Sequence, residues 1–380
     1  MAALRLTTAL REEGIDAKML VKEKQSEMSF VDALTNGHLP NKILAFIKEY
    51  GERLFLFTKI REKKDRFNFS LGNWGMSVAD HPLVQEADVV HLHWINKSFV
   101  SLKEISKISQ RKGGFVWTMH DMWSFTGGCH YAANCTNYQN ECGNCPMLNS
   151  PSEDDLSHQV WMEKRNVYSK NIVEGVTCSS WLEESARQSK LWKTNRIQTI
   201  NNAIDTDFFT PVKVSVEKNK DRKRRLLFVA RDIHDHRKGL DLLQASLDLL
   251  VKNRPELKDG MELIIAGDYK KQIEFSVPTT YLGFMNGAND LKKAYLQSDV
   301  FVLPSREDNL PNTLVEASAC GLASVAYKVG GIAEMIRHEK SGWLVEGENV
   351  EALSQALMFF MTCSESDLNQ YKSEARQLAL

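Results

Sequence analysis

The sequence lacks any apolar run that approaches the roughly 20 residues needed to span a membrane as a helix. Its first residues also lack the basic cluster and apolar stretch that mark a signal peptide. Neither sign of charge is in excess, because the chain has 48 Lys and Arg and 49 Asp and Glu, which gives a net charge of −1. Nothing in these totals favours a nucleic-acid partner. We therefore expect a cytoplasmic protein that binds no nucleic acid.

The chain also lacks the strand and glycine-rich loop with which a doubly wound nucleotide-binding domain normally opens. Residues 4–13 instead have helical spacing and end at Gly14, and residues 16–21 read as a strand. At the other end, residues 375–380 stop within a helical pattern. These features predict a sequence trimmed at both ends, with its first strand missing and its activity weakened or lost.

What the sequence does contain is an alternation of short apolar strands and amphipathic helices over 380 residues, enough for two or three domains. Residues 87–94 and 114–121 read as strands separated by a helical segment at 100–110, which predicts a parallel pair. The alternation restarts after the charged run 212–225. The predicted fold class is α/β. We expect a first Rossmann-like domain at 1–210, a linker at 211–225 and a second Rossmann-like domain at 226–380, with a cleft between them.

One stretch of the second half organises this prediction. Residues 299–303 form an apolar run typical of a buried parallel strand, and the polar turn that follows leads into a helix that ends near Gly321. Asn309 or Asn312 is expected to cap this helix, with Pro311 in its first turn. A helix N-terminus attracts anions. Two acids, Asp308 and Glu316, flank it, which suits a ligand with phosphates between hydroxyl groups, such as a nucleotide sugar.

Several motifs taken together resemble the family 4 glycosyltransferases, which are retaining enzymes of the two-domain GT-B fold. The resemblance covers about residues 170–350, and the first half resembles a bacterial subset of the family through residues 118–123 and a cysteine cluster. The matching segments are Asn202–Asp205 with Phe209 and Pro211, Phe228–Arg231 with Arg237–Gly239, Asp308–Gly321, Gly330–Glu334 and Ser341–Val345.

The resemblance implies a donor site in the second domain. Arg231 and Lys238 would bind the donor diphosphate, and Gly330 and Gly331 would offer it backbone N–H groups. Fixed cations suit this role because the leaving diphosphate gains charge in the transition state. Taken alone, the Arg and Lys could equally be surface residues at a strand–helix junction, and the glycines could simply permit a tight turn.

The resemblance also implies roles for the acids and for one histidine. Glu316 would bind the ribose hydroxyls, and Asp308 would orient the sugar where the family usually has Glu. Glu307 and Asn309 are neighbouring candidates for sugar binding, and a helix-dipole partner is the structural alternative for Glu316. His120 would line the donor-sugar side, whereas we interpret His91 and His93 as structural. Asp205-Thr206-Asp207 is also interpreted as structural, and no catalytic metal is expected.

Four of the seven cysteines lie within 17 residues, at Cys129, Cys135, Cys142 and Cys145. Four thiolates can hold a structural zinc ion, and Cys142-Gly143-Asn144-Cys145 has the form of a zinc knuckle. Disulfides and unpaired thiols are the alternatives. A zinc clamp on the 124–150 loop is the structural hypothesis.

Residues 41–60 form an apolar helix with basic flanks, continued by Arg61-Glu62-Lys63-Lys64. A packed helix with a solvated charged end is the more common structure for such a segment. Contact with a membrane surface or a lipid-linked acceptor is the functional alternative.

Together these observations predict a retaining glycosyltransferase that moves a sugar from a nucleotide-diphosphate sugar to a glycan or lipid-linked acceptor, in bacterial surface polysaccharide or glycolipid synthesis. It would work in the cytoplasm, peripherally at the inner face of the membrane. The alternatives are a nucleotide-sugar epimerase on the same fold and a non-catalytic, zinc-stabilised binding module. A phosphorylase is disfavoured because no pyridoxal-phosphate lysine signature is present.

Overall fold

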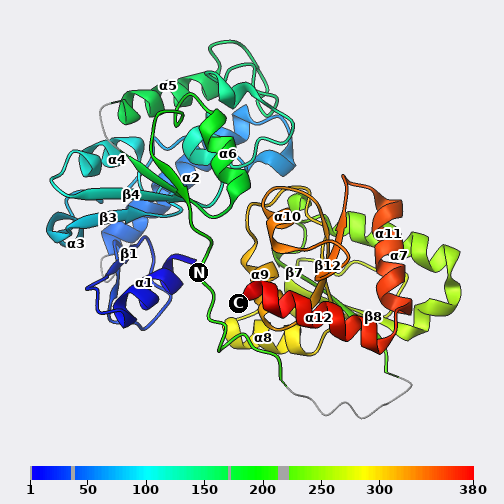
Figure 1. The fold of residues 1–380 in the computed structure, drawn as a ribbon. Helices are drawn as coiled ribbons and strands as arrows, with labels where there is room; N and C mark the ends of the chain where they lie inside the picture. Colours follow the sequence, from blue (N-terminus) through cyan, green and yellow to red (C-terminus); the bar gives the residue numbers. More distant parts are fainter. Residues whose placement is uncertain (1, 36–38, 170–172, 213–221) are drawn as a thin grey trace. The chain divides into compact units, whose positions relative to one another are not determined.

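The computed structural model describes residues 2–35, 39–169, 173–212 and 222–380. The chain forms two compact units, Met1–Ala203 and Ile204–Leu380, shown in Figure 1. The boundary precedes residue 210, the predicted end of the first domain, because Ile204 and Phe209 pack in the core of the second unit. Of the predicted linker 211–225, residues 213–221 lie outside the described residues, and Arg224 already begins a strand.

The first unit is built on a four-stranded parallel sheet in the order β3-β4-β5-β6. Its core gathers several tryptophans, and the rings of Trp117 and Trp123 lie 6.1 Å apart. Its elements are α1 (Ala2–Glu12), β1 (Met19–Val21), β2 (Val31–Ala33), α2 (Leu39–Lys59), η1 (Lys63–Asp65), α3 (Pro82–Glu86), β3 (Val89–Leu92), α4 (Leu102–Ser109), β4 (Gly114–Met119), η2 (Trp123–Phe125), η3 (Asn137–Gln139), α5 (Leu156–Tyr168), β5 (Glu174–Thr177), α6 (Ser180–Gln188) and β6 (Ile197–Thr199).

The predicted opening helix and strand are present, but the strand does not join this sheet. Gly14 follows α1 with a φ of +85°, and its N–H donates to the carbonyl of Arg11 over 3.0 Å, as in a helix C-terminal turn. The predicted strand 16–21 is β1, which pairs in parallel with β2 in a separate two-stranded sheet.

The second unit is a six-stranded parallel sheet in the order β12-β11-β10-β7-β8-β9. Counted from β7, this is the 3-2-1-4-5-6 order of a Rossmann sheet, whose switch point falls between β7 and β10. Its elements are β7 (Arg224–Asp232), η4 (His236–Lys238), α7 (Leu240–Asn253), η5 (Pro255–Gly260), β8 (Met261–Asp268), β9 (Thr279–Gly283), α8 (Ala288–Leu296), β10 (Val300–Leu303), α9 (Asn312–Ala319), β11 (Ala323–Tyr327), α10 (Ile332–Met335), β12 (Gly342–Val345), α11 (Val350–Thr362) and α12 (Glu365–Ala379).

Alternating residues of β7 enter two cores, one on each face of this sheet. Leu226 and Phe228 pack with residues of α7 and α11, whereas Leu227 and Val229 pack with residues of α8 and α9. All four residues of β10 are buried. Strands covered on both faces read as continuous apolar runs, which is why the sequence pattern located them.

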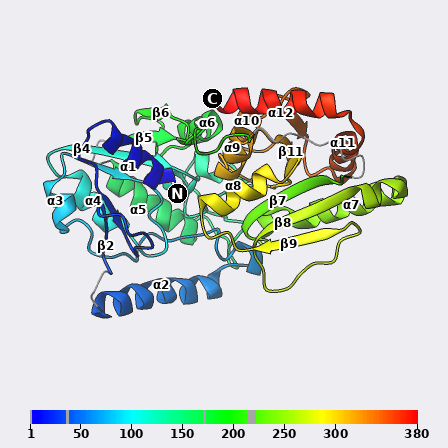
Figure 2. The same cartoon turned by 90° about the horizontal axis from the view of Figure 1, so that it is seen from below.

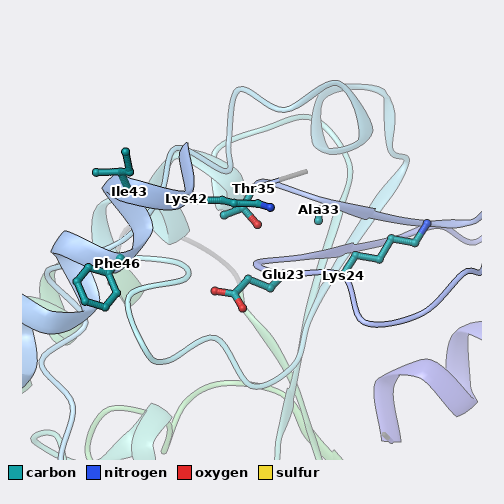
Figure 3. A pocket seen from close by; sticks show the side chains of 7 residues that line it. All are labelled: Glu23, Lys24, Ala33, Thr35, Lys42, Ile43 and Phe46. Atoms are coloured by element: carbon teal, nitrogen blue, oxygen red, sulfur yellow. The ribbon is translucent and has the colours of Figure 1, made fainter. Parts of the chain in front are cut away.

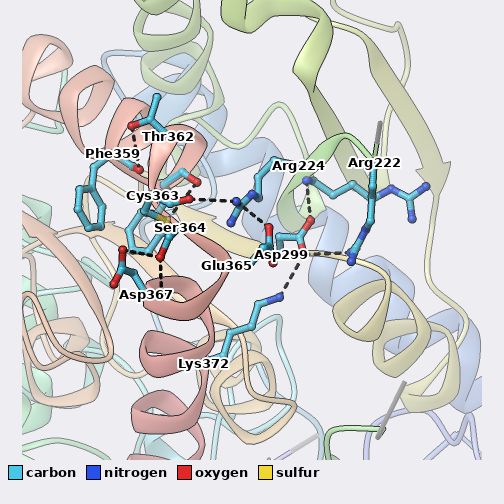
Figure 4. Close-up of polar contacts among 12 residues, drawn as sticks. Arg222, Arg224, Asp299, Phe359, Thr362, Cys363, Ser364, Glu365, Asp367 and Lys372 are labelled. Atoms are coloured by element: carbon cyan, nitrogen blue, oxygen red, sulfur yellow. Dashed lines mark hydrogen bonds and ion pairs between the residues drawn. The ribbon is translucent and has the colours of Figure 1, made fainter. Parts of the chain in front are cut away.

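A buried carboxylate fastens the last helix to this sheet, as Figure 4 shows. Asp299, 4% exposed, precedes β10. It accepts hydrogen bonds from Arg222 over 3.0 Å, from the Arg225 backbone N–H over 2.9 Å and from Lys372 of α12 over 3.1 Å. Arg222 and Arg225, which belong to the predicted linker 211–225, are therefore bonded to the second unit through Asp299.

One local prediction was wrong. Neither Asn309 nor Asn312 caps α9. Pro311 occupies the cap position with an extended ψ of 117°, and its carbonyl accepts from the N–H of Leu314 over 2.9 Å. The chain ends in two helices, α11 and α12, because Ser364 interrupts the helical run and caps α12 by accepting from the N–H of Asp367.

Candidate active site

The two loops at the switch point of the second unit touch through their backbones. Gly239 has a φ of +70°, and a Cβ atom placed there would lie 1.8 Å from the carbonyl oxygen of Pro304. Nearby, the N–H of Arg306 donates to the carbonyl of Arg237 over 2.8 Å. Glycine at 239 therefore allows the β7–α7 loop to pack directly on the turn that follows β10.

Asp308 and Lys238 form an ion pair inside this contact. The Nζ atom of Lys238 lies 2.5 Å from one oxygen of Asp308, and Nη1 of Arg237 lies 3.5 Å from the other. Burial opposes ionisation of Asp308, but the charges of Lys238 and Arg237 outweigh it and hold the pKa of this carboxyl below its usual value. An ionised acid thus lies between two cations at the carboxyl edge of the sheet.

The other residues predicted to bind the diphosphate differ in exposure. Arg231 is exposed at the end of β7, and its side chain makes no hydrogen bond or ion pair within the described residues. Gly330, with a φ of +53°, and Gly331 immediately precede α10, and the carbonyl of Gly331 accepts from the N–H of Glu334. α10 is a single short turn of four residues.

Glu316 lies in the buried part of α9 and is 1% exposed. Its carboxylate accepts a hydrogen bond of 2.8 Å from the hydroxyl of Tyr295 on α8. Asn309 is also buried, whereas Glu307 is half-buried and uses its carbonyl to accept from Arg237. Within this turn, Asp308 rather than Glu307 therefore contacts Lys238.

Three residues of this site were missed by the sequence reasoning. Arg237 contacts Asp308, and Tyr295 orients Glu316. Arg306 bridges the two loops by bonding the carbonyl of His236 and the carboxylate of Asp241. Arg237 could have been predicted as a site residue because it is adjacent to Lys238 in the sequence. No sequence motif near Tyr295 indicated that it would contact Glu316.

In the first unit, polar side chains form a chain of contacts just beyond the ends of β3, β4, β5 and β6. Nε2 of His120 lies 3.0 Å from Nδ1 of His93, and Nδ1 of His120 lies 3.4 Å from Sγ of Cys178. Cys178 in turn contacts Oδ1 of Asn202 over 3.1 Å. Both ring nitrogens of His120 are thus engaged, and His93, predicted to be structural, is its direct partner.

This array is held neutral by its surroundings. Burial, followed by the nearby His91 and His120, lowers the pKa of His93 to about 3. Burial also lowers the pKa of His120 to about 4, although Asp121 opposes the shift. Asp121 bonds His130 over 2.7 Å and the indole N–H of Trp94 over 3.0 Å.

The cysteine loop packs against a buried lysine that the sequence reasoning also missed. Lys164 of α5 donates to the carbonyls of Trp123 and Thr126. Its Nζ atom lies 3.6 Å from the centre of the Trp123 ring. Burial lowers its pKa to about 7. No cysteine in the described residues forms a disulfide.

The described residues contain no group of three or more His, Cys, Asp or Glu side chains placed to hold a metal ion. Burial raises the pKa of the Cys142 thiol to about 12 and that of Cys145 to about 11, so these thiols are protonated at neutral pH in this arrangement. Zinc binding by these four cysteines stays a prediction from their spacing.

A recess of about 530 Å³ lies in the first unit beside the start of α2 (Figure 3). It combines apolar and charged side chains from the β1–β2 region and from α2. The lining residues are Glu23, Lys24, Ala33, Thr35, Lys42, Ile43 and Phe46.

The sequence of the second unit matches a known protein family. Residues 212–378 match the family model described as Glycosyl transferases group 1. The putative colanic acid biosynthesis glycosyl transferase WcaC of Escherichia coli K12 is 29% identical over 280 residues, which cover 72% of this chain and 66% of WcaC. The chain spans about two thirds of the length of the first curated relatives that it matches.

Solved structures match over the whole chain. Sucrose-phosphate synthase from Thermosynechococcus elongatus superposes with a TM-score of 0.62 at 17% identity, covering 99% of this chain and 86% of the synthase. Anabaena HepE in complex with UDP-glucose gives a TM-score of 0.58 at 15% identity, covering 100% of this chain and 90% of HepE. The chain thus has the GT-B fold of two Rossmann-like domains, and residues 212–378 are similar in sequence to the glycosyl transferases of group 1.

Proposed function

We propose that this chain is a retaining glycosyltransferase that transfers a sugar from a nucleotide-diphosphate sugar to an acceptor hydroxyl. The observation that carries the proposal is the cluster at the β7/β10 switch point, where Asp308 is held between Lys238 and Arg237. Rossmann sheets bind nucleotides at this position. The match of residues 212–378 to glycosyl transferases group 1 supports the same reaction class.

The donor diphosphate is assigned to two cations of the second unit, Arg231 and Lys238. Arg231 is exposed at the carboxyl end of β7 and offers an unpaired guanidinium within the described structure. Lys238 is close by in sequence and already bound to Asp308, so it can be shared between the acid and a phosphate. Cations fixed in this way stabilise the charge that builds on the leaving diphosphate. Gly330 and Gly331 remain candidates for backbone contacts to the phosphates.

The acids are assigned to the two ends of the donor. Glu316, oriented by Tyr295, would accept hydrogen bonds from the ribose hydroxyls. Asp308 would accept from hydroxyls of the donor sugar, with Glu307 and Asn309 beside it. His120 of the first unit stays a proposed residue for contact with the donor sugar. Both ring nitrogens of His120 already have partners. The sugar could therefore contact the face of the imidazole ring without breaking either of these contacts.

The proposed reaction keeps the anomeric configuration. The bond between the anomeric carbon and the diphosphate oxygen breaks, and its electron pair leaves with the diphosphate. The acceptor oxygen attacks the same face of the anomeric carbon and passes its proton to the departing phosphate oxygen. No covalent nucleophile is assigned to the protein, so its residues bind, orient and neutralise charge.

The biological setting is part of the proposal. A glycan or lipid-linked acceptor, and a place in bacterial surface polysaccharide or glycolipid synthesis, are supported by the similarity to WcaC, which is named for colanic acid biosynthesis. The reaction is assigned to the cytoplasm, at the inner face of the membrane.

The test is binding of nucleotide-diphosphate sugars to the full chain, screened as a panel by thermal shift and then measured by calorimetry. Arg231→Ala and Glu316→Gln should each weaken binding of the selected donor at least tenfold. Arg254→Ala is the matched control, because Arg254 follows α7 at the opposite edge of the sheet. Unchanged donor affinity in both variants would contradict the assignment of Arg231 and Glu316 to the donor site.

Turnover then separates the alternatives. A transferase should hydrolyse its donor slowly when acceptor is absent, an epimerase should convert the donor sugar, and a binding module should leave it intact. No observation on this structure specifically favours either alternative.

A further inference from the structure

Helix α2 of the first unit exposes an apolar stripe along its whole length. Figure 2 shows α2 as a long helix at the margin of this unit. Each side chain of the stripe is between 50% and 68% exposed, which is unusual for large apolar residues that share one helix face. We call the following set the α2 stripe: Leu39, Ile43, Phe46, Ile47, Tyr50, Leu54 and Phe57.

The spacing of the stripe is helical. Its members stand four, seven, eight, eleven, fifteen and eighteen residues after Leu39, so they lie on one face of the helix. A different face attaches α2 to the unit, because Ala45, Glu52 and Leu56 are the buried residues of the helix. Glu52 anchors that face by accepting from the N–H of Leu71 and the hydroxyl of Ser98. The stripe is therefore not the core-facing side of α2.

Basic side chains accompany the stripe. Residues 39–67 contain eight Lys or Arg against four Asp or Glu, a net charge of +4 in a chain whose total is −1. Two of the cations lie over exposed aromatic rings. The guanidinium of Arg66 is 3.7 Å from the centre of the Phe57 ring, and that of Arg53 is 5.6 Å from the centre of Phe67, which is 73% exposed.

This combination fits the boundary between the acyl chains and the head groups of an anionic membrane. Apolar and aromatic side chains enter the acyl region, and Lys and Arg stay at the level of the phosphates. A second copy of the chain is a poorer fit, because it would bring another positively charged segment against this one. No described helix is long and apolar enough to cross a membrane, so the geometry is that of a helix lying in the plane of the surface.

We propose that α2 and the segment up to Phe67 bind the surface of a membrane that contains anionic phospholipid, with the α2 stripe inserted. The recess of Figure 3 shares Ile43 and Phe46 with the stripe. Membrane binding would therefore hold this partly polar recess at the level of the head groups. The inference does not depend on the proposed glycosyl transfer, because lipid binding can be measured without any donor.

The experiment is co-flotation of the full chain with vesicles of phosphatidylcholine, with and without one quarter phosphatidylglycerol. The wild-type chain should bind the anionic vesicles at least tenfold more strongly than the neutral ones, and 0.5 M salt should reduce this preference. Phe46→Ser with Ile47→Ser should lower binding to anionic vesicles at least tenfold. Lys59→Glu with Arg61→Glu, which brings the segment to zero net charge, should abolish the anionic preference.

A matched control removes equally exposed apolar side chains elsewhere. Ile200 and Phe284 are 54% and 53% exposed and lie outside α2. The variant Ile200→Ser with Phe284→Ser should bind vesicles like the wild type, and circular dichroism should show that every variant is folded. The proposal is overturned if the wild type ignores anionic vesicles or if the stripe variant binds them unchanged. It is also overturned if light scattering shows that the wild type is a dimer and that the stripe variant is a monomer.

Discussion

At the scale of single residues, the contact between Lys238 and Asp308 decides how the proposed donor site is charged. Asp308 is buried and ionised, so removal of one cation leaves a poorly compensated charge. Lys238→Met should destabilise the second unit by about 2–3 kcal/mol. Lys238→Met combined with Asp308→Asn should cost less than the sum of the single changes, with a coupling of about 1–2 kcal/mol.

Urea unfolding followed by far-UV circular dichroism, arranged as a double-mutant cycle, measures this coupling. Additive single changes would show that the pair contributes nothing beyond its separate members. Donor binding in the same variants separates stability from recognition, since Asp308→Asn keeps the shape of the side chain but loses its charge.

The histidine array of the first unit gives a second prediction at this scale. The folded-state pKa values of His93 and His120, about 3 and about 4, lie below the ordinary value of 6.5. Between pH 6.5 and about 4 the unfolded chain therefore binds protons that the folded chain does not. Stability present above pH 6.5 should be lost as the pH falls, each histidine adding up to about 1.4 kcal/mol per pH unit to the slope.

His93→Gln should flatten this dependence. Tryptophan fluorescence is a suitable probe, because seven of the eight tryptophans lie in the first unit. His236→Gln is the control, since His236 is an exposed histidine of the second unit. An identical pH slope in His93→Gln and the wild type would contradict the buried, neutral array.

At the scale of elements, the β7–α7 loop and the turn after β10 depend on one close approach. Ala at position 239 would need a positive φ and would place its Cβ atom 1.8 Å from the carbonyl of Pro304. Gly239→Ala should therefore separate the two loops, cost about 2–4 kcal/mol and weaken donor binding.

Gly347→Ala isolates the effect of the backbone angle. Gly347 has a φ of +61°, but a Cβ atom added there would meet nothing within 4 Å. The substitution should cost only about 1 kcal/mol and leave donor affinity unchanged. If both variants bind donor like the wild type, the loop contact does not shape the site.

At the scale of the whole molecule, the last helix closes the second unit onto its first residues. Arg376 of α12 donates to the carbonyls of Thr206 and Phe209 and also to that of Ala319 at the end of α9. Arg376→Ala leaves three carbonyls without this donor and should cost about 2–3 kcal/mol.

Calorimetry of the full chain should show the thermal transition of the second unit lowered by about 4–8 °C. Arg337→Ala is the matched control, because Arg337 is 57% exposed and lies 4.0 Å from its partner Glu374. A similar small shift in both variants would mean that α12 is held by its apolar contacts alone.

The local pattern of the chain was enough to predict much of this architecture. The β10 run Val300–Leu303, the helix after Pro311 and the restart of the alternation near residue 225 all follow from apolar periodicity and turn residues. Asp308 and Glu316 were identified as candidates because they flank the start of a helix. Local patterning fails at Pro311, where the sequence offered several residues able to begin a helix.

The sequence by itself determined the fold class, the alternating elements and the residue types of the candidate site, because periodicity and turn chemistry act over a few neighbouring residues. Only the tertiary structure decided which of those residues meet. The strand order of the second sheet brings Lys238 against Asp308, 70 positions away, and helix packing brings Tyr295 to Glu316. The attachment of α2 by Ala45, Glu52 and Leu56 likewise decided that its other apolar face stays exposed. Such pairings arise when strands order and helices pack, which no local pattern encodes.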